Sequence, residues 1–353
     1  MSRFFSEKFA SLTPYTPGEQ PRERTYIKLN TNESPFPPSP VALRLARQAA
    51  GSVNLYSDPT CLSIRKAAAE RYGIDADEVM FTNGSDDILN FAFMAFCDEQ
   101  HPVAFPDITY GFYPVFANLH RIPYETIPLQ DDFSLRVEDY IGLGKTIFIA
   151  NPNAPTGIAL PLADIERIVA GNPDNVVVID EAYVDFGGES AVPLIHKYDN
   201  LLVTQTFSKS RNLAGARLGM GFGCKSLMQD LNTLRYSTNP YNINSVTMAA
   251  GIGALTDEAY FRFCCQNIME NRAWTQQELT RLGFQMPPSS TNFLFARHPE
   301  IPGKEIYLSL KEKGILVRHF DDAKLTDYNR ITIGSKEEMQ ALIHALEEIV
   351  CAK

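Results

Sequence analysis

One short segment, residues 206–219, holds the side chains with the clearest capacity for chemistry. Lys209 stands there beside the hydroxyl side chains of Thr206 and Ser208, and Arg217 follows eight positions after the lysine. A phosphorylated aldehyde cofactor requires this combination, because a lysine forms an imine with the aldehyde while hydroxyl groups and an arginine hold the phosphate. A polar loop with solvated cations explains the same residues, so the segment alone does not decide the function.

A second group of polar side chains follows an apolar run at residues 176–179. Asp180 ends this run, and Tyr183 lies three positions further along the chain. In a cleft, Asp180 would keep a pyridine nitrogen protonated, which makes the ring an electron sink, and Tyr183 would hydrogen-bond the ring oxygen. The alternative for Asp180 is an N-cap of a following helix, where aspartate is common.

Backbone amides and one aromatic ring extend this pattern. Residues 83–87, Asn-Gly-Ser-Asp-Asp, lie between an expected strand and an expected helix. The free N–H groups of Ser85 and Asp86 would form an anion site there, although the acidic side chains would repel a phosphate unless they cap the helix. Tyr110 can stack on an aromatic ring, and a place in the core is its alternative.

Short apolar runs alternate with helical stretches and supply the elements that must position these residues. The expected strands are 79–82, 102–105, 146–150, 176–180, 201–204 and 220–223, and the expected helices are 62–72, 86–97 and 162–170. This alternation predicts an α/β fold with a mostly parallel sheet flanked by helices. Ligands of such sheets bind outside the carboxyl ends of the strands, which is where Asn83, Asn151, Asp180 and Thr206 fall.

The length of 353 residues predicts a large domain and a smaller one. Residues 1–40, rich in Pro, Thr, Ser and Asn, are expected to form an N-terminal arm, and residues 41–255 the large cofactor-binding domain. Residues 256–353 are expected to form a small α+β domain. Its expected helices are 257–281 and 336–350, and its expected strands are 292–296, 315–319 and 330–333.

Composition argues against several functional classes. The net charge of −10, without a Lys/Arg cluster, argues against a nucleic-acid surface. The longest apolar stretch, residues 91–97, is far shorter than the about 20 residues that span a bilayer. The N-terminus lacks the apolar core of a secretory signal. Six cysteines without CxxC spacing indicate reduced thiols, so we expect a cytoplasmic protein, and we expect no metal site.

Together these segments resemble the fold type I aminotransferases, and the resemblance covers nearly the whole chain in the same order. It implies pyridoxal 5′-phosphate as cofactor, with Lys209 as the Schiff-base lysine that serves as covalent anchor and general acid/base. It also implies that Asp180 partners the pyridine nitrogen, that Tyr183 contacts O3′ and that Tyr110 stacks on the ring. The implied phosphate site consists of Ser85, Asp86, Thr206, Ser208 and Arg217.

Within that group the chain resembles the histidinol-phosphate aminotransferases. The similar motifs are Leu-Thr-Pro-Tyr at 12–15, Leu-Asn-Thr-Asn-Glu at 29–33, Leu-Tyr-Ser-Asp-Pro at 55–59 and Asn-Pro-Tyr-Asn-Ile-Asn at 239–244. This resemblance implies amino transfer between L-histidinol phosphate and 2-oxoglutarate in histidine biosynthesis. It places Tyr56 at the cofactor phosphate of the other subunit, which implies a homodimer with shared active sites.

The same resemblance implies a set of substrate contacts: Tyr15, Asn32, Tyr241, Asn242, Arg318 and Arg330. Arg330 matches the arginine that receives the anionic end of the substrate, and Arg318 would supply a second cation for a phosphate. The alternative for Arg318 is a surface salt bridge.

One position departs from the family pattern. The family has asparagine immediately before a Pro-Thr-Gly turn, where it hydrogen-bonds O3′, whereas this chain has Ala154. Either Tyr183 serves O3′ alone, or Asn153 or a water substitutes. We also expect the Ala154–Pro155 bond to be cis, because ordered cis bonds are found mostly in tight turns.

Three alternatives remain open. An aromatic amino acid aminotransferase would keep every cofactor residue and differ in its use of Arg318, Arg330 and the arm. A threonine-phosphate decarboxylase on the same scaffold would release CO₂. A transcription regulator with an aminotransferase-like domain would carry an N-terminal DNA-binding domain, whereas this chain has an arm of 40 residues there.

Overall fold

The structure is a computed structural model, which describes residues 2–10, 12–14, 18–21 and 23–352. Seven strands form one sheet in the order β2-β8-β7-β6-β5-β3-β4. Their bounds are β2 (Val79–Thr82), β3 (Val103–Pro106), β4 (Tyr124–Ile127), β5 (Thr146–Ala150), β6 (Val177–Asp180), β7 (Leu201–Thr206) and β8 (Gly219–Phe222). Only β8 runs against its neighbours, β2 and β7. The expected α/β fold with a mostly parallel sheet is therefore confirmed.

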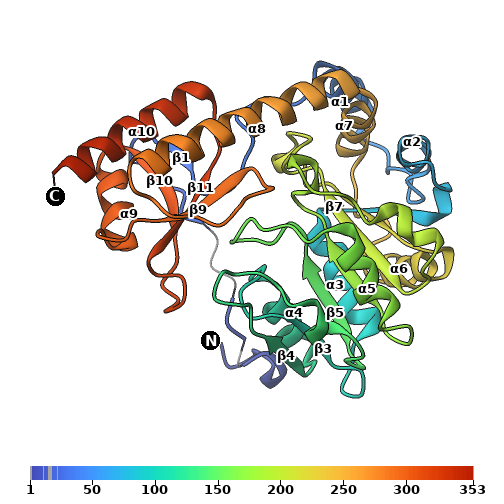
Figure 1. Cartoon of the computed structure of the whole chain (residues 1–353). Coiled ribbons are helices and arrows are strands. Elements are labelled where there is room, and N and C mark those ends of the chain that lie inside the picture. The colour runs from blue at the N-terminus through green and yellow to red at the C-terminus, as the bar shows by residue number, and fades with distance from the viewer. Residues whose placement is uncertain (1, 11, 15–17, 22, 353) are drawn as a thin grey trace.

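Helices cover both faces of this sheet (Figure 1). They are α1 (Pro40–Ala49), α2 (Leu62–Tyr72), α3 (Ser85–Phe96), α4 (Tyr113–His120), α5 (Leu162–Ala170), α6 (Lys225–Thr238) and α7 (Ser245–Thr256). Strand residues alternate between two hydrophobic clusters: Val177 and Ile179 pack with residues of α2, α5 and α7, whereas Val178 packs with residues of α3, α4 and α6. Because both faces are buried, the central strands are apolar throughout.

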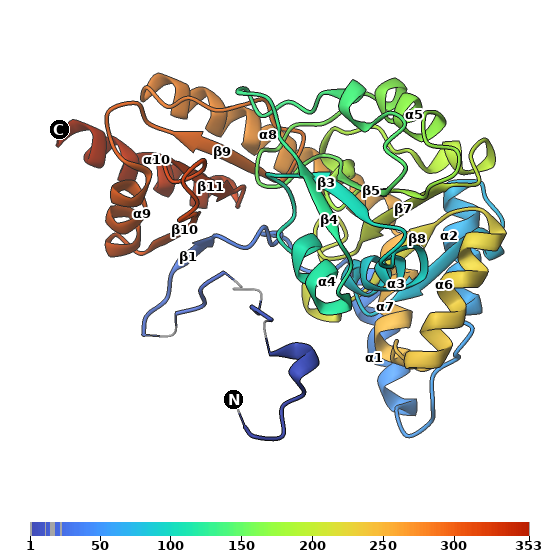
Figure 2. The ribbon, with the colours of Figure 1, turned by 90° about the horizontal axis from the view of Figure 1, so that it is seen from below.

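A second sheet of four strands has the order β1-β10-β11-β9. Its strands are β1 (Ile27–Leu29), β9 (Phe293–Arg297), β10 (Ile315–His319) and β11 (Tyr328–Thr332), and α8 (Glu258–Arg281), α9 (Gly303–Glu312) and α10 (Lys336–Cys351) accompany them. In Figure 1, α8 reaches from this sheet to the α1–α7 pair. Figure 2 shows β1 beside β10, with the described residues before β1 lying outside both sheets.

Two strands were not expected from the sequence. β1 has three residues and lies in the predicted arm, yet it pairs in parallel with β10. β4 is an edge strand whose first three residues are exposed, so it lacks an apolar run. The predicted domain limits remain predictions, but residues 27–29 belong to the second sheet.

Local signals account for several element limits. The hydroxyl of Ser39 accepts a hydrogen bond from the Ala42 amide, and Pro40 follows at the first position of α1. Ser335 and Glu338 form a capping box at the start of α10. Seven short 3-10 helices are also described: Glu7–Phe9, Ala50–Ser52, Ala76–Glu78, Val137–Tyr140, Val184–Phe186, Val192–His196 and Ala214–Ala216.

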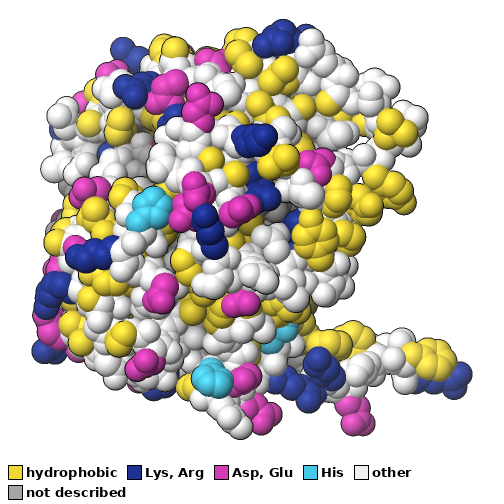
Figure 3. All heavy atoms as spheres, turned by 90° about the vertical axis from the view of Figure 1, so that its right-hand side faces the viewer, with side chains coloured by type: hydrophobic (Ala, Val, Ile, Leu, Met, Phe, Trp, Pro, Cys, Tyr) yellow, Lys and Arg dark blue, Asp and Glu magenta, His cyan; other side chains and the backbone are white. Residues whose placement is uncertain are grey.

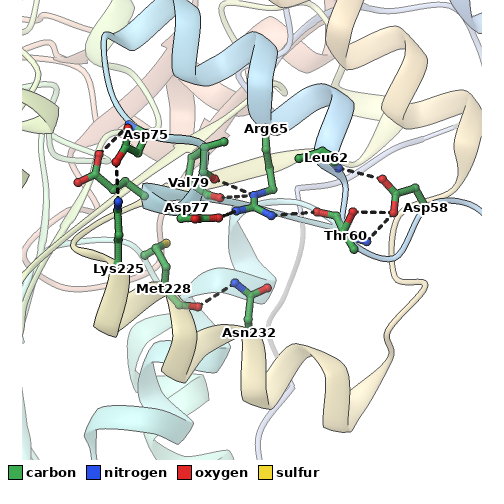
Figure 4. Close-up of polar contacts among 12 residues, drawn as sticks. Asp58, Thr60, Leu62, Arg65, Asp75, Asp77, Val79, Lys225, Met228 and Asn232 are labelled. Atoms are coloured by element: carbon green, nitrogen blue, oxygen red, sulfur yellow. Dashed lines mark hydrogen bonds and ion pairs between the residues drawn. The ribbon is translucent and has the colours of Figure 1, made fainter.

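A polar network fixes the segment before α2 to the sheet (Figure 4). The Arg65 guanidinium donates to the carbonyls of Ala76 and Val79 and pairs with Asp77. The Asp58 carboxylate accepts from the amides of Thr60 and Leu62. Arg65 also donates to the carbonyl of Thr60 at 3.5 Å, so its guanidinium joins the loop before α2 to the start of β2. Across the described part of the chain, no helix is long and apolar enough to cross a membrane.

Candidate active site

The carboxyl ends of the central strands surround a cavity of about 350 Å³. Its lining contains nine residues that the sequence analysis selected: Ser85, Asp86, Tyr110, Asp180, Tyr183, Thr206, Ser208, Lys209 and Arg217. They come from the ends of β6 and β7, the start of α3 and the loops beside them. The fold thus brings together residues that lie far apart in the sequence, at the edge where ligands of such sheets bind.

One part of this cavity is built to receive an anion. The Arg217 guanidinium donates to the Ser208 hydroxyl at 3.4 Å, and the Thr206 hydroxyl donates to that of Ser208 at 3.0 Å. Helix α3 begins here, and no described side chain caps it, which leaves its first amides directed at the same region. These donors fit the phosphate of the implied cofactor.

Gly84 makes this arrangement possible. It precedes α3 with φ +91°, and a Cβ atom there would lie 2.6 Å from Nη2 of Arg217. A side chain at position 84 would therefore displace the guanidinium, and the backbone conformation also favours glycine. Arg217 itself has φ +52°, an uncommon value for a residue with a side chain.

Asp86 does not oppose the anion site as an unpaired acid. Its carboxylate lies 3.2 Å from Nη2 of Arg217 and accepts the Tyr110 hydroxyl at 2.8 Å. The expected repulsion is therefore relieved by pairing with Arg217 rather than by capping α3. Tyr110 lines the cavity, so it is not confined to the core.

Asp180 is a buried acid at the end of β6, with 4% of its surface exposed. Its carboxylate accepts the hydroxyls of Tyr113 at 3.1 Å and Thr204 at 3.0 Å. Burial raises its pKa from 3.8 to about 6, because the charged form loses water. The N-cap alternative does not hold, since the next helix begins only at Val184. A buried carboxylate fits the protonated ring nitrogen of the implied cofactor, which would supply the missing positive charge.

Lys209 lies between the arm and Tyr183. Its Nζ donates to the carbonyl of Thr31 at 3.3 Å and lies 5.8 Å from the centre of the Tyr183 ring. Thr31 and Glu33 also line the cavity, and Glu33 pairs with Lys28 at 2.7 Å. The arm therefore forms part of the site through its residues 31–33.

A second cavity of about 370 Å³ adjoins the first. Both are lined by Thr31, Tyr110, Ala154, Tyr183 and Lys209, so they meet at the lysine. The second cavity also contains Asn32, Arg318 and Arg330. Arg318 and Arg330 stand directly opposite each other on β10 and β11. Like charges opposite each other destabilise a strand pair, and an anion between them would offset this cost.

Some predicted site residues lie elsewhere. Among the residues described, Tyr56, Tyr241 and Asn242 do not line either cavity. The rings of Tyr56 and Tyr241 stack at 4.6 Å on the surface, where 85% of Tyr56 is exposed. Tyr15 lies outside the described residues.

The structure shows whether Asn153 can replace the asparagine that the family has at the position of Ala154. Asn153 cannot replace the missing amide, because its Nδ2 donates to the Ile108 carbonyl and the Thr156 hydroxyl, both at 3.0 Å. Its Oδ1 accepts the Thr109 hydroxyl. The Ala154–Pro155 bond is cis, as predicted, and Asn151–Pro152 is cis as well.

The sequence did not predict the residues that hold Asp180 and Lys209 in position. Tyr113 and Thr204 hold Asp180, and the carbonyl of Thr31 receives Lys209. One signal was available for Thr204: it lies two residues before Thr206 on the same strand, so both side chains point to one face. Thr31 lies within the motif at 29–33, but the motif does not show that its carbonyl receives Lys209, and we find no signal for Tyr113.

Comparisons with known proteins agree with this geometry. The sequence model of the family "Aminotransferase class I and II" matches residues 24–346. The chain therefore belongs to the class I and II aminotransferases, and it is a transaminase.

The similar proteins indicate to which group within this family the chain belongs. Histidinol-phosphate aminotransferases from Marinomonas sp. (strain MWYL1) and Brachyspira hyodysenteriae are 50% and 47% identical to this chain, over 99% of it and 100% and 99% of their own lengths. The crystal structure of histidinol-phosphate aminotransferase from Sinorhizobium meliloti in complex with pyridoxal-5'-phosphate has a TM-score of 0.88 and 25% identity. It covers 100% of this chain and 99% of that one. Within its family, the chain groups with the histidinol-phosphate aminotransferases.

Replacing Asp180 with asparagine in the cofactor-free protein is expected to change the pH dependence of stability. Because burial raises the folded-state pKa of Asp180 from 3.8 to about 6, the folded protein keeps a proton that the unfolded chain releases. The stability of the wild type relative to Asp180→Asn should therefore fall as the pH rises from about 4 to about 6, by roughly 3 kcal/mol, and stay level above that. Denaturant unfolding at a series of pH values measures the difference.

Glu181→Gln is the matched control. Glu181 is the neighbouring buried acid, but it does not line the cavity, and burial raises its pKa from 4.5 to about 7. Its window of pH dependence should therefore extend about one pH unit higher. A stability difference for Asp180→Asn that is the same at every pH would contradict the assignment of a raised pKa.

Proposed function

We propose that this protein transfers the amino group of L-histidinol phosphate to 2-oxoglutarate in histidine biosynthesis, with pyridoxal 5′-phosphate carried on Lys209. The observation that carries the substrate assignment is the pair Arg318 and Arg330, directly opposite each other in a cavity that meets the cofactor cavity at Lys209. A phosphate carries about 1.5 to 2 negative charges near neutral pH and can use two cations at different angles. The names of the similar proteins support the same substrate.

Each part of the site has a role in this proposal. The cofactor supplies an electron sink when bound. Arg217, Ser208 and the first amides of α3 would hold its phosphate, Asp180 would pair with its ring nitrogen, and Tyr183 would donate to its ring oxygen. Lys209 would anchor the cofactor, and its amine would move the proton at the reacting carbon of the substrate.

The two alternatives within the family use the same cofactor site. An aromatic amino acid aminotransferase would need one arginine for the carboxylate of its donor, whereas the phosphate of histidinol phosphate can use both Arg318 and Arg330. A threonine-phosphate decarboxylase would release CO₂, and analysis of the products separates that reaction from amino transfer. Steady-state kinetics with histidinol phosphate, phenylalanine and tyrosine compare the donor classes directly.

Arg318→Ala is expected to impair the reaction of histidinol phosphate far more than that of phenylalanine. Loss of one charge-assisted contact should lower kcat/KM for the phosphorylated donor about 10- to 150-fold. Arg330→Ala should lower kcat/KM for both donors. Arg297→Ala is the control, because Arg297 lies on β9 of the same sheet and bonds Gln285 instead of lining either cavity. Equal losses for both donors with Arg318→Ala would favour the aromatic aminotransferase.

We propose further that the working form is a homodimer in which Tyr56 serves the cofactor phosphate of the partner subunit. Support comes from the loop before α2, where Val53, Leu55 and Tyr56 are 63%, 67% and 85% exposed. Stacking on Tyr241 and the bond from the Ser57 hydroxyl to the Ile243 carbonyl fix this loop in an outward position. Figure 3 views the side of the molecule that carries α2, and hydrophobic side chains project at its edge.

Mixing Lys209→Ala with Tyr56→Ala subunits is expected to restore activity that neither variant has alone. Half of randomly exchanged dimers are hybrids with one complete site, so recovery should reach about a quarter of the wild-type activity. The control replaces the Tyr56→Ala chain by one that carries both substitutions, because no complete site can then form. A wild-type protein that sediments as a fully active monomer would contradict the proposal.

We also infer that the protein acts on small molecules in the cytoplasm. All six cysteines are free, which supports a reducing compartment. The net charge of −10 and the interspersed charges on the face in Figure 3 support a partner other than a nucleic acid.

A further inference from the structure

Asn32 connects the second sheet with the tyrosine of the cofactor cavity. It follows β1, is 1% exposed and has φ +54°, an uncommon conformation for a residue other than glycine. Its Nδ2 lies 2.9 Å from the Tyr183 hydroxyl, and its Oδ1 lies 3.0 Å from Oγ1 of Thr332 on β11. Its backbone is held on both sides, because its N–H donates to Thr332 and its carbonyl accepts from Asn292.

These contacts fix which end of the Asn32 amide faces each partner. Thr332 is 1% exposed, so its hydroxyl hydrogen needs an acceptor inside the protein. Oγ1 of Thr332 already accepts the Asn32 N–H at 2.9 Å, and the acceptor described for its own hydrogen is Oδ1 of Asn32. Since Oδ1 faces Thr332, the atom that faces Tyr183 is Nδ2, which can only donate.

The Tyr183 hydroxyl therefore accepts a hydrogen bond from Asn32. A phenol has one hydrogen, and because Asn32 offers no acceptor to it, that hydrogen is directed away from Asn32. Tyr183 lines both cavities, and the lining of the first cavity also includes Ala150, Ala154 and Ala182, whose side chains offer no donor. The direction of the Tyr183 hydroxyl hydrogen is thus set by Asn32, which does not line the first cavity.

We propose that Asn32 is a positioning residue, which holds the Tyr183 hydroxyl so that its hydrogen is donated to the cofactor. This inference rests on the proposed function. It adds an action through Tyr183 to the expected contact of Asn32 with the substrate, because Asn32 also lines the second cavity. Ala154 makes the role more important, because neither Ala154 nor the engaged amide of Asn153 offers a second donor.

Thr332 connects the hydrogen bonds of Asn32 to the strand that carries Arg330. Thr332 lies two residues after Arg330 on β11, so both side chains point to the same face of that strand. The strand that carries Arg330 therefore also sets the orientation of Asn32. The hydrogen-bond direction at Tyr183 depends in this way on the second sheet being in place.

An absorbance titration of the cofactor-loaded protein tests the role of Asn32 without relying on turnover. Donation to the ring oxygen draws charge away from the nitrogen that joins Lys209 to the cofactor, so loss of the donor should raise the proton affinity of that nitrogen. Asn32→Leu, which is similar in size and adds no charge, should raise the midpoint of the titration by about one pH unit, a tenfold change. Tyr183→Phe should raise it at least as much.

The double variant is decisive. If Asn32 acts through the Tyr183 hydroxyl, Asn32→Leu should cause no further change in the Tyr183→Phe background. Thr332→Val, which removes the hydroxyl that orients Asn32, should raise the midpoint in the same direction and carries the test if Asn32→Leu does not fold. Asn172→Leu is the control, because Asn172 is also buried but donates to the carbonyls of Tyr140 and Ile168 and lines neither cavity.

The outcomes separate this inference from the proposed function. A protein that takes up no absorbing cofactor would overturn both. A cofactor that titrates normally, with a midpoint that Asn32→Leu and Thr332→Val leave unchanged, would overturn only the role of Asn32. Asn32→Leu could also raise the titration midpoint equally in the wild type and in the Tyr183→Phe variant. That result would overturn the role of Asn32 as well, because it would show that Asn32 acts through packing.

Discussion

The site depends on one buried charge. Asp180 ends the central strand β6 and is almost fully enclosed, with a hydroxyl on each carboxylate oxygen but no cation beside it among its described hydrogen-bond partners. A buried carboxylate loses its contact with water, so it either takes up a proton or binds a positive group. The raised pKa of Asp180 reflects the free-energy cost of burying the charged form. In the proposed function a protonated ring nitrogen satisfies this constraint, so the acid would select both the type of ligand and its orientation.

The remaining charges follow from where the strands end. Arg217 precedes β8 and holds one end of the first cavity, while Arg318 and Arg330 on β10 and β11 line the second. Lys209 stands where the cavities meet. In a chain of net charge −10, the second cavity is thereby locally cationic, because Lys209, Arg318 and Arg330 line it with one acid, Asp107. Two sheets are needed for this arrangement, because the cofactor groups come from the first and the paired arginines from the second.

The sequence predicted the elements with strong apolar patterns and missed those without them. The limits of β2, β5, α2 and α5 agree with the prediction, whereas β1 and β4 are too short or too exposed to show a pattern. Motif residues were found in the cavity because each carries its own chemical signature. Tyr113, Thr31 and Thr332 carry none, since their roles arise from contacts over long sequence separations. The pairing of Asp86 with Arg217 was hidden for the same reason.

The central claim is that Lys209 carries the cofactor, and reduction with borohydride followed by peptide mapping tests it most directly. Borohydride converts the bond between the lysine and the cofactor into a stable amine, so the modified peptide identifies the residue. The account predicts that the modification lies on Lys209, in the peptide that contains Thr206 and Ser208, and that Lys209→Ala abolishes it. Modification of a different lysine in the wild type would contradict the assignment of the site.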